Sequence, residues 1–178
     1  VIAFTINFSV RHTNVIFLKR INPFLSVGYG VPGLILAVGI VQMFTYLDKG
    51  IFIGFDFVLT GSLFGLLLAY LIKSYALSNS TIESGFERLS NRLDDSARVL
   101  KSSGWNLLLR VHFPLMKTSL LTSILLVMSE VVKELPATLI LRPFNFDTLA
   151  VSTYIYAAEE RMFEAASPAI AIVVIGLI

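Results

Sequence analysis

The sequence predicts an all-α, polytopic transmembrane helical bundle, and two observations lead to that prediction. Hydrophobic residues make up 56% of the 178 residues and charged residues only 15%, whereas soluble domains average about 45–50% and about 25%. The apolar residues also gather in long runs separated by short charged stretches. A run of about 18 or more apolar residues is long enough to cross the hydrocarbon layer as a helix. Such a composition excludes a disordered chain, which would be polar and highly charged.

Several kinds of chemistry are excluded or disfavoured by the composition. The chain has no cysteine, which excludes thiol catalysis, thiolate metal sites and a disulfide-stapled module. His12 and His112 are the only histidines, and their distance along the chain gives no metal-ligand spacing. No serine with a plausible base nearby and no G-x-x-x-x-G-K-[ST] phosphate loop occurs. We therefore expect no catalytic residue, metal site or cofactor. The small net charge of +2 does not indicate a nucleic-acid binder.

Three runs are long enough to span a membrane, and two shorter runs lie at the ends of the sequence. The full runs cover residues 27–47, 57–77 and 115–132, and the shorter runs cover 1–10 and 169–178. Lys73 lies near one end of its run, where a lysine can snorkel to the interface. We expect residues 1–178 to form one partial transmembrane permease domain that is cut inside a helix at both ends.

The loops between these runs differ in positive charge, and this difference predicts their orientation. Residues 11–26 and 78–114 fall on one side, and residues 48–56 and 133–168 on the other. The first pair carries eight basic residues: Arg11, Lys19, Arg20, Arg88, Arg92, Arg98, Lys101 and Arg110. The second pair carries four: Lys49, Lys133, Arg142 and Arg161. The positive-inside rule places the first pair in the cytoplasm.

Small residues recur at spacings that bring helices together. Gly61 and Gly65 form a G-x-x-x-G pair, and Ser119 and Ser123 form a second small-x-x-x-small pair. Such pairs allow helix backbones to approach closely in lipid. Glycines and Pro32 also cluster over residues 28–33. This cluster predicts either a loop-to-helix transition with proline near the helix start or a hinge.

The predicted cytoplasmic loop, residues 78–114, is too long for a simple connector and has helical patterning. Residues 95–101 form a short helical segment, in which Asp94 or Asp95 can act as the N-cap or favour the positive end of the helix dipole. Residues 102–104 break this segment. Residues 105–111 form a second amphipathic stretch, which Pro114 closes. Two short helices around a turn suit docking into a groove on a partner.

This loop resembles the EAA loop of permease subunits in binding-protein-dependent ABC importers, which have the MetI-like fold. The family pattern is Glu-Ala-Ala-x3-Gly-x9-Ile-x-Leu-Pro. Aligned on the proline, the corresponding residues are Asp95, Ser96, Ala97, Lys101, Val111, His112, Phe113 and Pro114. Ala97 and Pro114 match the pattern outright, and Asp95, Ser96, Val111 and Phe113 are conservative changes. Lys101 departs from the family glycine, and Gly104 is placed to provide the turn three residues later.

Three further stretches are similar to ferric-iron permeases, and they place this chain with the C-terminal half of such proteins. They are residues 132–150, Glu83 to Gly85, and Gly28 to Gly33. The resemblance implies a pore subunit in the inner membrane that is not itself an enzyme. It also implies three partners: a cytoplasmic ABC ATPase dimer docked on residues 95–110, an extracytoplasmic iron-binding protein, and a second permease half.

The resemblance assigns roles within the coupling loop. Asp95 offers a carboxylate to the ATPase, whereas Val99, Leu100 and Trp105 supply apolar anchors. Pro114 fixes the exit of the loop into the next span.

The outer end of the third full span carries a charged cluster with a proline behind it. Glu130, Lys133 and Glu134 are candidates for the substrate path, because charges near a membrane usually face a bundle interior or water. Lys133 and Glu130 lie three apart on one helix face, so a simple ion pair is the alternative. Pro136 ends or kinks the helix, and such a break near a pore mouth is a candidate gate.

Other functions remain open at this level. Within the same class, the solute could instead be thiamine, sulfate or a phosphonate, since the coupling loop does not distinguish solutes. An ion channel or a secondary transporter needs polar groups or broken helices at the bilayer midplane. The predicted spans are mostly aliphatic there, which disfavours this alternative.

Overall fold

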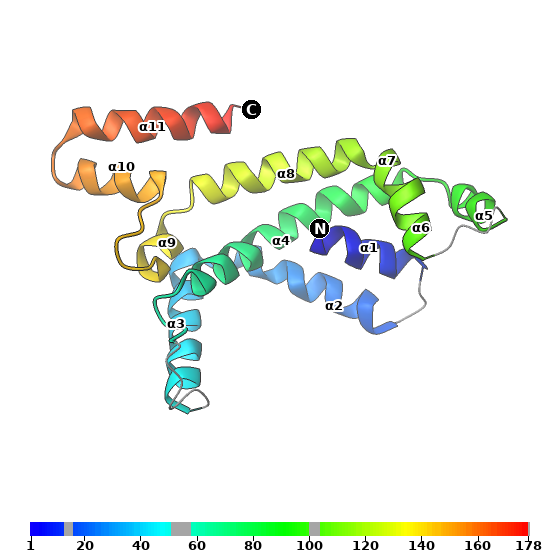
Figure 1. The fold of residues 1–178 in the computed structure, drawn as a ribbon, viewed down its shortest axis with the longest axis horizontal. Helices are drawn as coiled ribbons and strands as arrows, with labels where there is room; N and C mark the ends of the chain where they lie inside the picture. Colours follow the sequence, from blue (N-terminus) through cyan, green and yellow to red (C-terminus); the bar gives the residue numbers. More distant parts are fainter. Residues whose placement is uncertain (13–15, 51–57, 100–103, 178) are drawn as a thin grey trace. The chain divides into compact units, whose positions relative to one another are not determined.

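The computed structural model describes residues 1–12, 16–50, 58–99 and 104–177, and these residues contain helices and no strand (Figure 1). The predicted all-α class is confirmed. The helices are α1 (Ile2–His12), α2 (Ile16–Ser26), α3 (Gly33–Gly50), α4 (Leu63–Glu87), α5 (Asn91–Val99), α6 (Trp105–Leu107), α7 (Phe113–Leu115), α8 (Lys117–Val132), α9 (Pro136–Leu141), α10 (Leu149–Ala158) and α11 (Met162–Gly176). A 3₁₀ turn, Val27–Gly30, precedes α3, and a π-helical segment, Leu108–His112, joins α6 to α7.

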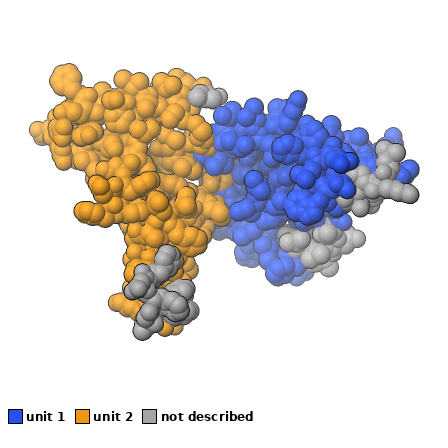
Figure 2. Space-filling view, in the orientation of Figure 1, with its two compact units in different colours: residues 1–28, 75–127 blue, residues 29–74, 128–178 orange. Residues whose placement is uncertain are grey.

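The described chain divides into two compact units. Unit 1 comprises residues 1–28 and 75–127, and unit 2 comprises residues 29–74 and 128–178 (Figure 2). Helices α4 and α8 contribute residues to both units.

Unit 1 has an aromatic core that explains why α4 is longer than the sequence predicts. The span was expected to end at residue 77, because polar residues follow it, but α4 continues to Glu87. Asn79, Ile82 and Phe86 are buried on one face of this extension, with the spacing of an amphipathic helix. The ring of Phe4 stacks on Phe86 with centroids 5.5 Å apart. Apolar burial therefore extends the helix beyond the predicted loop boundary.

A second predicted loop also contains a helix. Residues 11–26 were expected to be a loop, whereas Ile16–Ser26 forms α2. Asn22 is buried, and its side-chain carbonyl accepts a hydrogen bond of 2.8 Å from the hydroxyl of Tyr75. A buried polar partner of this kind is not visible in a hydropathy pattern, which explains the error.

The predicted close approach at Ser119 and Ser123 is confirmed within unit 1. The hydroxyl of Ser123 donates a 2.9 Å hydrogen bond to Ser78 on α4. A Cβ atom added at Gly85 would lie only 2.6 Å from Oγ of Ser119, so the two helices are too close there for a larger residue.

Unit 2 is built on contacts of α3 with α4 and α9. Its buried core comprises Ala37, Ile40, Phe44, Leu59, Leu66, Ala69, Ala137 and Leu141. A Cβ atom added at Gly65 would lie 3.1 Å from the ring of Phe44, so Gly65 permits close packing as predicted. Gly61 has a different role, because it lies in the turn before α4 with φ of 76°.

The described helices differ from the predicted spans in length and continuity. None of them alone has both the length and the apolarity needed to cross a membrane. Two bent pairs meet these criteria on length and composition: residues 20–30 with 33–50, and residues 105–115 with 117–132.

Candidate functional site

The first half of the predicted coupling loop folds as helix α5, which begins earlier than expected. The helix starts at Asn91 rather than Asp95. Oγ of Ser90 accepts a hydrogen bond from the backbone N–H of Arg92, so Ser90 provides the cap that the sequence assigned to Asp94 or Asp95. Asp94 instead lies in the first turn, where a carboxylate is favoured by the helix dipole.

The residues matched to the EAA pattern separate into an outward and an inward set. Asp95 and Ser96 are exposed, and Val99 is 83% exposed. Ala97 is buried, so the face of α5 that carries it packs against the rest of unit 1. Leu100, a predicted anchor, and Lys101, at the position of the family glycine, lie outside the described residues.

The second half of the loop is a continuous helical run of mixed type from Trp105 to Leu115. It starts after Gly104, which has φ of 55°, a left-handed conformation that favours glycine. The side chain of Trp105 is 69% exposed. The backbone N–H of Phe113 donates to the carbonyl of Leu108, five residues earlier. This run therefore contains a π-helical turn.

The π-helical turn explains why the proline does not close the segment as predicted. Pro114 is exposed and lies within α7. A proline in a regular helix clashes with the carbonyl four residues earlier, and the wider turn directly before Pro114 relieves that clash. The helix bends by 76° only at Met116. Val111, the other matched residue here, is half-buried.

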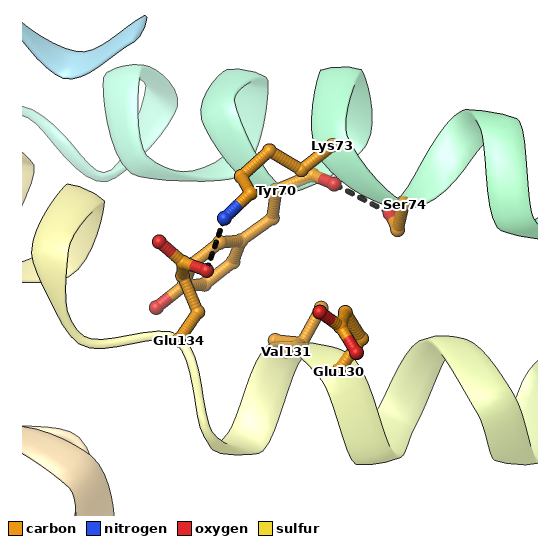
Figure 3. Close-up of a pocket in the computed structure, with 6 residues that line it drawn as sticks. All are labelled: Tyr70, Lys73, Ser74, Glu130, Val131 and Glu134. Atoms are coloured by element: carbon orange, nitrogen blue, oxygen red, sulfur yellow. Dashed lines mark hydrogen bonds and ion pairs between the residues drawn. The ribbon is translucent and has the colours of Figure 1, made fainter. Parts of the chain in front are cut away.

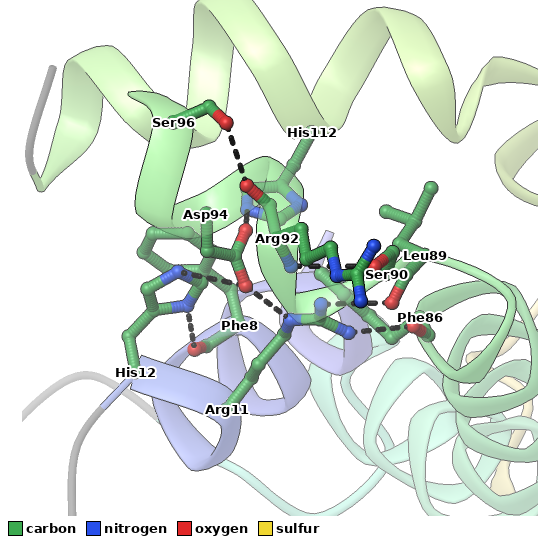
Figure 4. A network of polar contacts seen from close by, with 10 residues as sticks. All are labelled: Phe8, Arg11, His12, Phe86, Leu89, Ser90, Arg92, Asp94, Ser96 and His112. Atoms are coloured by element: carbon green, nitrogen blue, oxygen red, sulfur yellow. Dashed lines mark hydrogen bonds and ion pairs between the residues drawn. The ribbon is translucent and has the colours of Figure 1, made fainter. Parts of the chain in front are cut away.

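A buried charged cluster fastens the inner side of α5 to α1 and to the end of α4 (Figure 4). Oδ2 of Asp94 accepts a 2.7 Å hydrogen bond from Nε of Arg11. The two terminal nitrogens of Arg11 donate to the carbonyls of Phe86 and Leu89, at 2.6 and 2.9 Å. One guanidinium therefore connects three helical elements through charge-assisted hydrogen bonds.

Both histidines join this cluster, although they lie far apart in the sequence. Nε2 of His112 is 3.0 Å from Oδ1 of Asp94, and Nε2 of His12 is 3.7 Å from Oδ2. The two imidazole rings have centroids 5.2 Å apart. His112 is 1% exposed, and this burial lowers its pKa below the ordinary value, while the charge of Asp94 acts in the opposite direction. The sequence did not predict this cluster, because its members come from three separate elements.

The charged residues after α8 form two separate pairs. Lys133 and Glu130 make a 2.8 Å ion pair with side chains 57% and 24% exposed, which confirms the simple pairing considered for them. The hydrogen bond from this pair raises the pKa of Lys133. Glu134 is buried and forms its ion pair with Lys73 of α4. Pro136 is the first residue of α9, so the break in the helix is also confirmed.

The Lys73–Glu134 pair belongs to a small polar network in unit 2 (Figure 3). The hydroxyl of Thr138 donates to the backbone carbonyl of Glu134 at 2.7 Å, and the hydroxyls of Tyr70 and Thr138 are 2.7 Å apart. A cavity of about 10 Å³ lies beside the pair, which is about the space of one water molecule. A Cβ atom added at Gly33 would lie 2.5 Å from Oε1 of Glu134, so this network depends on a glycine in α3.

Unit 1 contains a larger polar pocket that the sequence did not predict. Its volume is about 360 Å³. Six hydroxyl side chains and one arginine line it: Ser80, Thr81, Ser84, Thr118, Ser119, Thr122 and Arg88. Hydroxyl and guanidinium groups together are suited to hydrogen bonding with an oxyanion.

The helical fold, the two bent helix pairs and the resemblance of residues 95–114 to the EAA loop agree with a polytopic membrane permease. Residues 2–178 match the family described as binding-protein-dependent transport system inner membrane component. The chain belongs to this family, which has the MetI-like fold, and it is therefore a multi-pass inner-membrane protein. The family consists of transport components rather than catalytic subunits.

Two curated relatives share 27% identity with this chain over 120 residues. They come from Salmonella typhimurium strain LT2 and Salmonella choleraesuis strain SC-B67, and both are named as candidate 2-aminoethylphosphonate transport system permease protein PhnV. The alignment covers 67% of this chain and 45% of each relative. The matched segment is thus less than half the length of these relatives.

Proposed function

We propose that this chain is part of the pore-forming permease subunit of an ATP-driven importer, and that residues 95–114 couple the ATPase to transport. The observation that carries the proposal is the two-sided character of this segment. Asp95, Val99 and Trp105 are exposed on its outer side, which provides a carboxylate and apolar anchors for a partner groove. Asp94 and Ala97 are buried on its inner side.

The buried side connects the segment to neighbouring helices, so that a movement of the segment is transmitted to them. Asp94 is tied through Arg11 to α1 and to carbonyls at the end of α4, so a force on α5 reaches both helices. A pore for a pumped solute must not be open to both sides at once. Closure of an ATPase dimer would move the segment and shift the helices between inward- and outward-facing packings, a rigid-body transition between two states.

The proposed complex contains three kinds of component besides this chain. A cytoplasmic ABC ATPase dimer hydrolyses ATP, and an extracytoplasmic solute-binding protein delivers the solute. A second permease half, fused or separate, completes the pore. Within this chain, Glu130, Lys133, Glu134 and Pro136 remain candidates for the pore lining or the gate. Glu134 is the strongest of them, because its buried pairing with Lys73 connects α4 to the break before α9.

Iron(III) is the proposed solute, and the support for it is the similarity of residues 132–150 to ferric-iron permeases. A phosphonate is the second candidate. It is favoured by the names of the two relatives and by the pocket lined by hydroxyl groups and Arg88, whose chemistry suits an oxyanion better than a metal cation.

ATP-dependent uptake into vesicles tests both the importer function with its coupling segment and the identity of the solute. The full-length permease would be reconstituted with its ATPase and binding protein, and labelled Fe³⁺ and labelled 2-aminoethylphosphonate would be supplied separately. We expect uptake that requires ATP and the binding protein and that is lost in Asp95→Lys. Uptake of phosphonate alone would refute the iron assignment and retain the importer. Failure of the ATPase to bind the permease would refute the coupling role.

A further inference from the structure

The strongest unexplained feature of the described chain is the convergence of His12, Asp94 and His112 inside unit 1 (Figure 4). Each side chain offers one ligand atom, and the three atoms lie within 4.8 Å of one another. We propose that these residues form a binding site for a divalent transition-metal ion of the zinc class. The site lies on the inner side of α5. It shares Asp94 with the contacts proposed to transmit ATPase motion, and it contains none of the candidates for the pore lining or the gate.

The first argument is the hydrogen bonding of His12. Its Nδ1 lies 3.1 Å from the backbone carbonyl of Phe8. Because a carbonyl oxygen only accepts, Nδ1 carries the proton, and in the neutral ring Nε2 holds the lone pair. This is the arrangement by which a backbone carbonyl orients a metal-binding histidine. Nε2 is buried, has no hydrogen-bond partner and lies 3.7 Å from a carboxylate oxygen of Asp94. Two lone pairs that face each other repel, and a positive charge between them, from a proton or a metal ion, removes that repulsion.

The second argument comes from His112 and the other oxygen of Asp94. Both ring nitrogens of His112 and Oδ1 of Asp94 are buried without a well-aligned hydrogen bond, although Nε2 and Oδ1 are only 3.0 Å apart. Buried polar atoms are nearly always satisfied. A single ion would satisfy one atom on each of the three side chains.

The geometry is close to that of a tetrahedral site. Bonds of about 2.0–2.1 Å at tetrahedral angles place ligand atoms roughly 3.3 Å apart. The 3.0 Å separation between Nε2 of His112 and Oδ1 of Asp94 is close to that value. The two histidine nitrogens are no more than 4.8 Å apart, so they need to approach by roughly 1.5 Å at most. Two imidazoles and one carboxylate suit Zn²⁺, Co²⁺ or Ni²⁺ rather than Mg²⁺ or Ca²⁺.

Arg11 limits the strength of this site. Its guanidinium is bonded to Oδ2 of Asp94, which leaves Oδ1 for a metal but adds a nearby positive charge. Repulsion between the guanidinium and a dication weakens binding, so we expect a micromolar rather than a nanomolar affinity. The ion would join α1, α5 and the π-helical segment. A metal bound there would therefore stiffen the coupling segment. The effect of this stiffening on transport rests on the proposed function, whereas metal binding itself does not.

Cobalt absorption tests the site directly. The full-length permease, purified with its ATPase and treated with a chelator, would be titrated with Co²⁺ while the visible ligand-field bands are recorded. We expect one Co²⁺ per permease, with the band intensity of a tetrahedral site, a micromolar dissociation constant and displacement by Zn²⁺. Absence of stoichiometric binding by the unmodified protein would overturn the proposal, and this result does not depend on whether any variant folds.

Variants then assign the ligands. His12→Gln, His112→Gln and Asp94→Asn should each weaken Co²⁺ binding by more than about ten-fold, since even supporting residues of metal sites contribute that much. Glu87→Gln is the control, because Glu87 is an exposed carboxylate at the end of α4, and it should bind like the unmodified protein. Equal binding by folded His12→Gln and His112→Gln variants would place the metal elsewhere and refute the assignment.

Discussion

The buried ion pair between Lys73 and Glu134 provides the sharpest test of the packing in unit 2. Its side chains are only 17% and 9% exposed. Replacing Glu134 by Gln keeps the shape but leaves the ammonium of Lys73 without its carboxylate. Breaking a buried pair in this way costs about 3–5 kcal/mol of unfolding free energy. Because Lys73 retains some access to solvent, we expect about 3 kcal/mol for Glu134→Gln.

The double variant separates the pair from its individual members. Lys73→Met together with Glu134→Gln removes both charges, and such replacements are often close to neutral. We expect the double variant to recover at least about 2 kcal/mol relative to the single Glu134→Gln variant. The pair of Lys133 with Glu130 is the matched control, because its side chains are much more exposed. Loss of that pair should cost no more than about 1 kcal/mol.

The assay is the unfolding free energy of the full-length permease in mixed micelles, measured for both pairs as double-mutant cycles. A cost below about 1 kcal/mol for Glu134→Gln, or equal coupling energies for the two pairs, would refute the reasoning. Either result would mean that Glu134 is solvated in the assembled protein and does not fasten α4 to the segment before α9.

Three further predictions concern close approaches and the coupling surface. Gly33→Ala should lower the stability by about 1–3 kcal/mol, because the added Cβ would lie 2.5 Å from Oε1 of Glu134. Gly39→Ala is the control: open space surrounds this position, so the variant should be neutral or stabilising in thermal unfolding. Equal effects of the two variants would contradict this prediction. Gly85→Ala should destabilise the protein by a similar amount, about 1–3 kcal/mol, through contact with Ser119 at 2.6 Å, and an unchanged unfolding temperature would argue against that packing. Trp105→Ala should leave the unfolding temperature unchanged but reduce recovery of the ATPase in co-purification, because this side chain is exposed; full recovery would remove it from the docking surface.

Hydropathy predicted the helical class and several helix boundaries, and its failures have a common cause. The end of α8 at Val132 and the break before Pro136 follow from the charged residues and the proline that come next. The extension of α4 to Glu87 was missed because Asn79 and its neighbours are polar. These polar residues are helical because Ile82 and Phe86 lie on the same face and are buried. Polar residues that share a helix face with a core are therefore misread as loop.

The spacing of residues 95–114 led to the proposed coupling segment, but it did not predict which residues form the inner face of that segment. The spacing drew attention to Asp95, which is exposed, whereas the neighbouring Asp94 is buried and bonded to Arg11. Sequence separation gave no reason to connect His12 with His112. Their proximity depends on the packing of α1 against the π-helical segment, and that packing involves the ring of Phe8. A tertiary cluster of this kind has no sequence period.

Cysteine cross-linking to the ATPase is the most direct test of the central claim that residues 95–114 form the coupling surface. This part of the protein has no cysteine, so single cysteines can be introduced at Val99 and Trp105, which are exposed, and at Leu107, which is buried. We predict cross-links from the two exposed positions to cysteines placed along the docking groove of the ATPase, with yields that change on ATP binding, and none from Leu107. Absence of cross-links from both exposed positions in an assembled, transport-active complex would contradict the account.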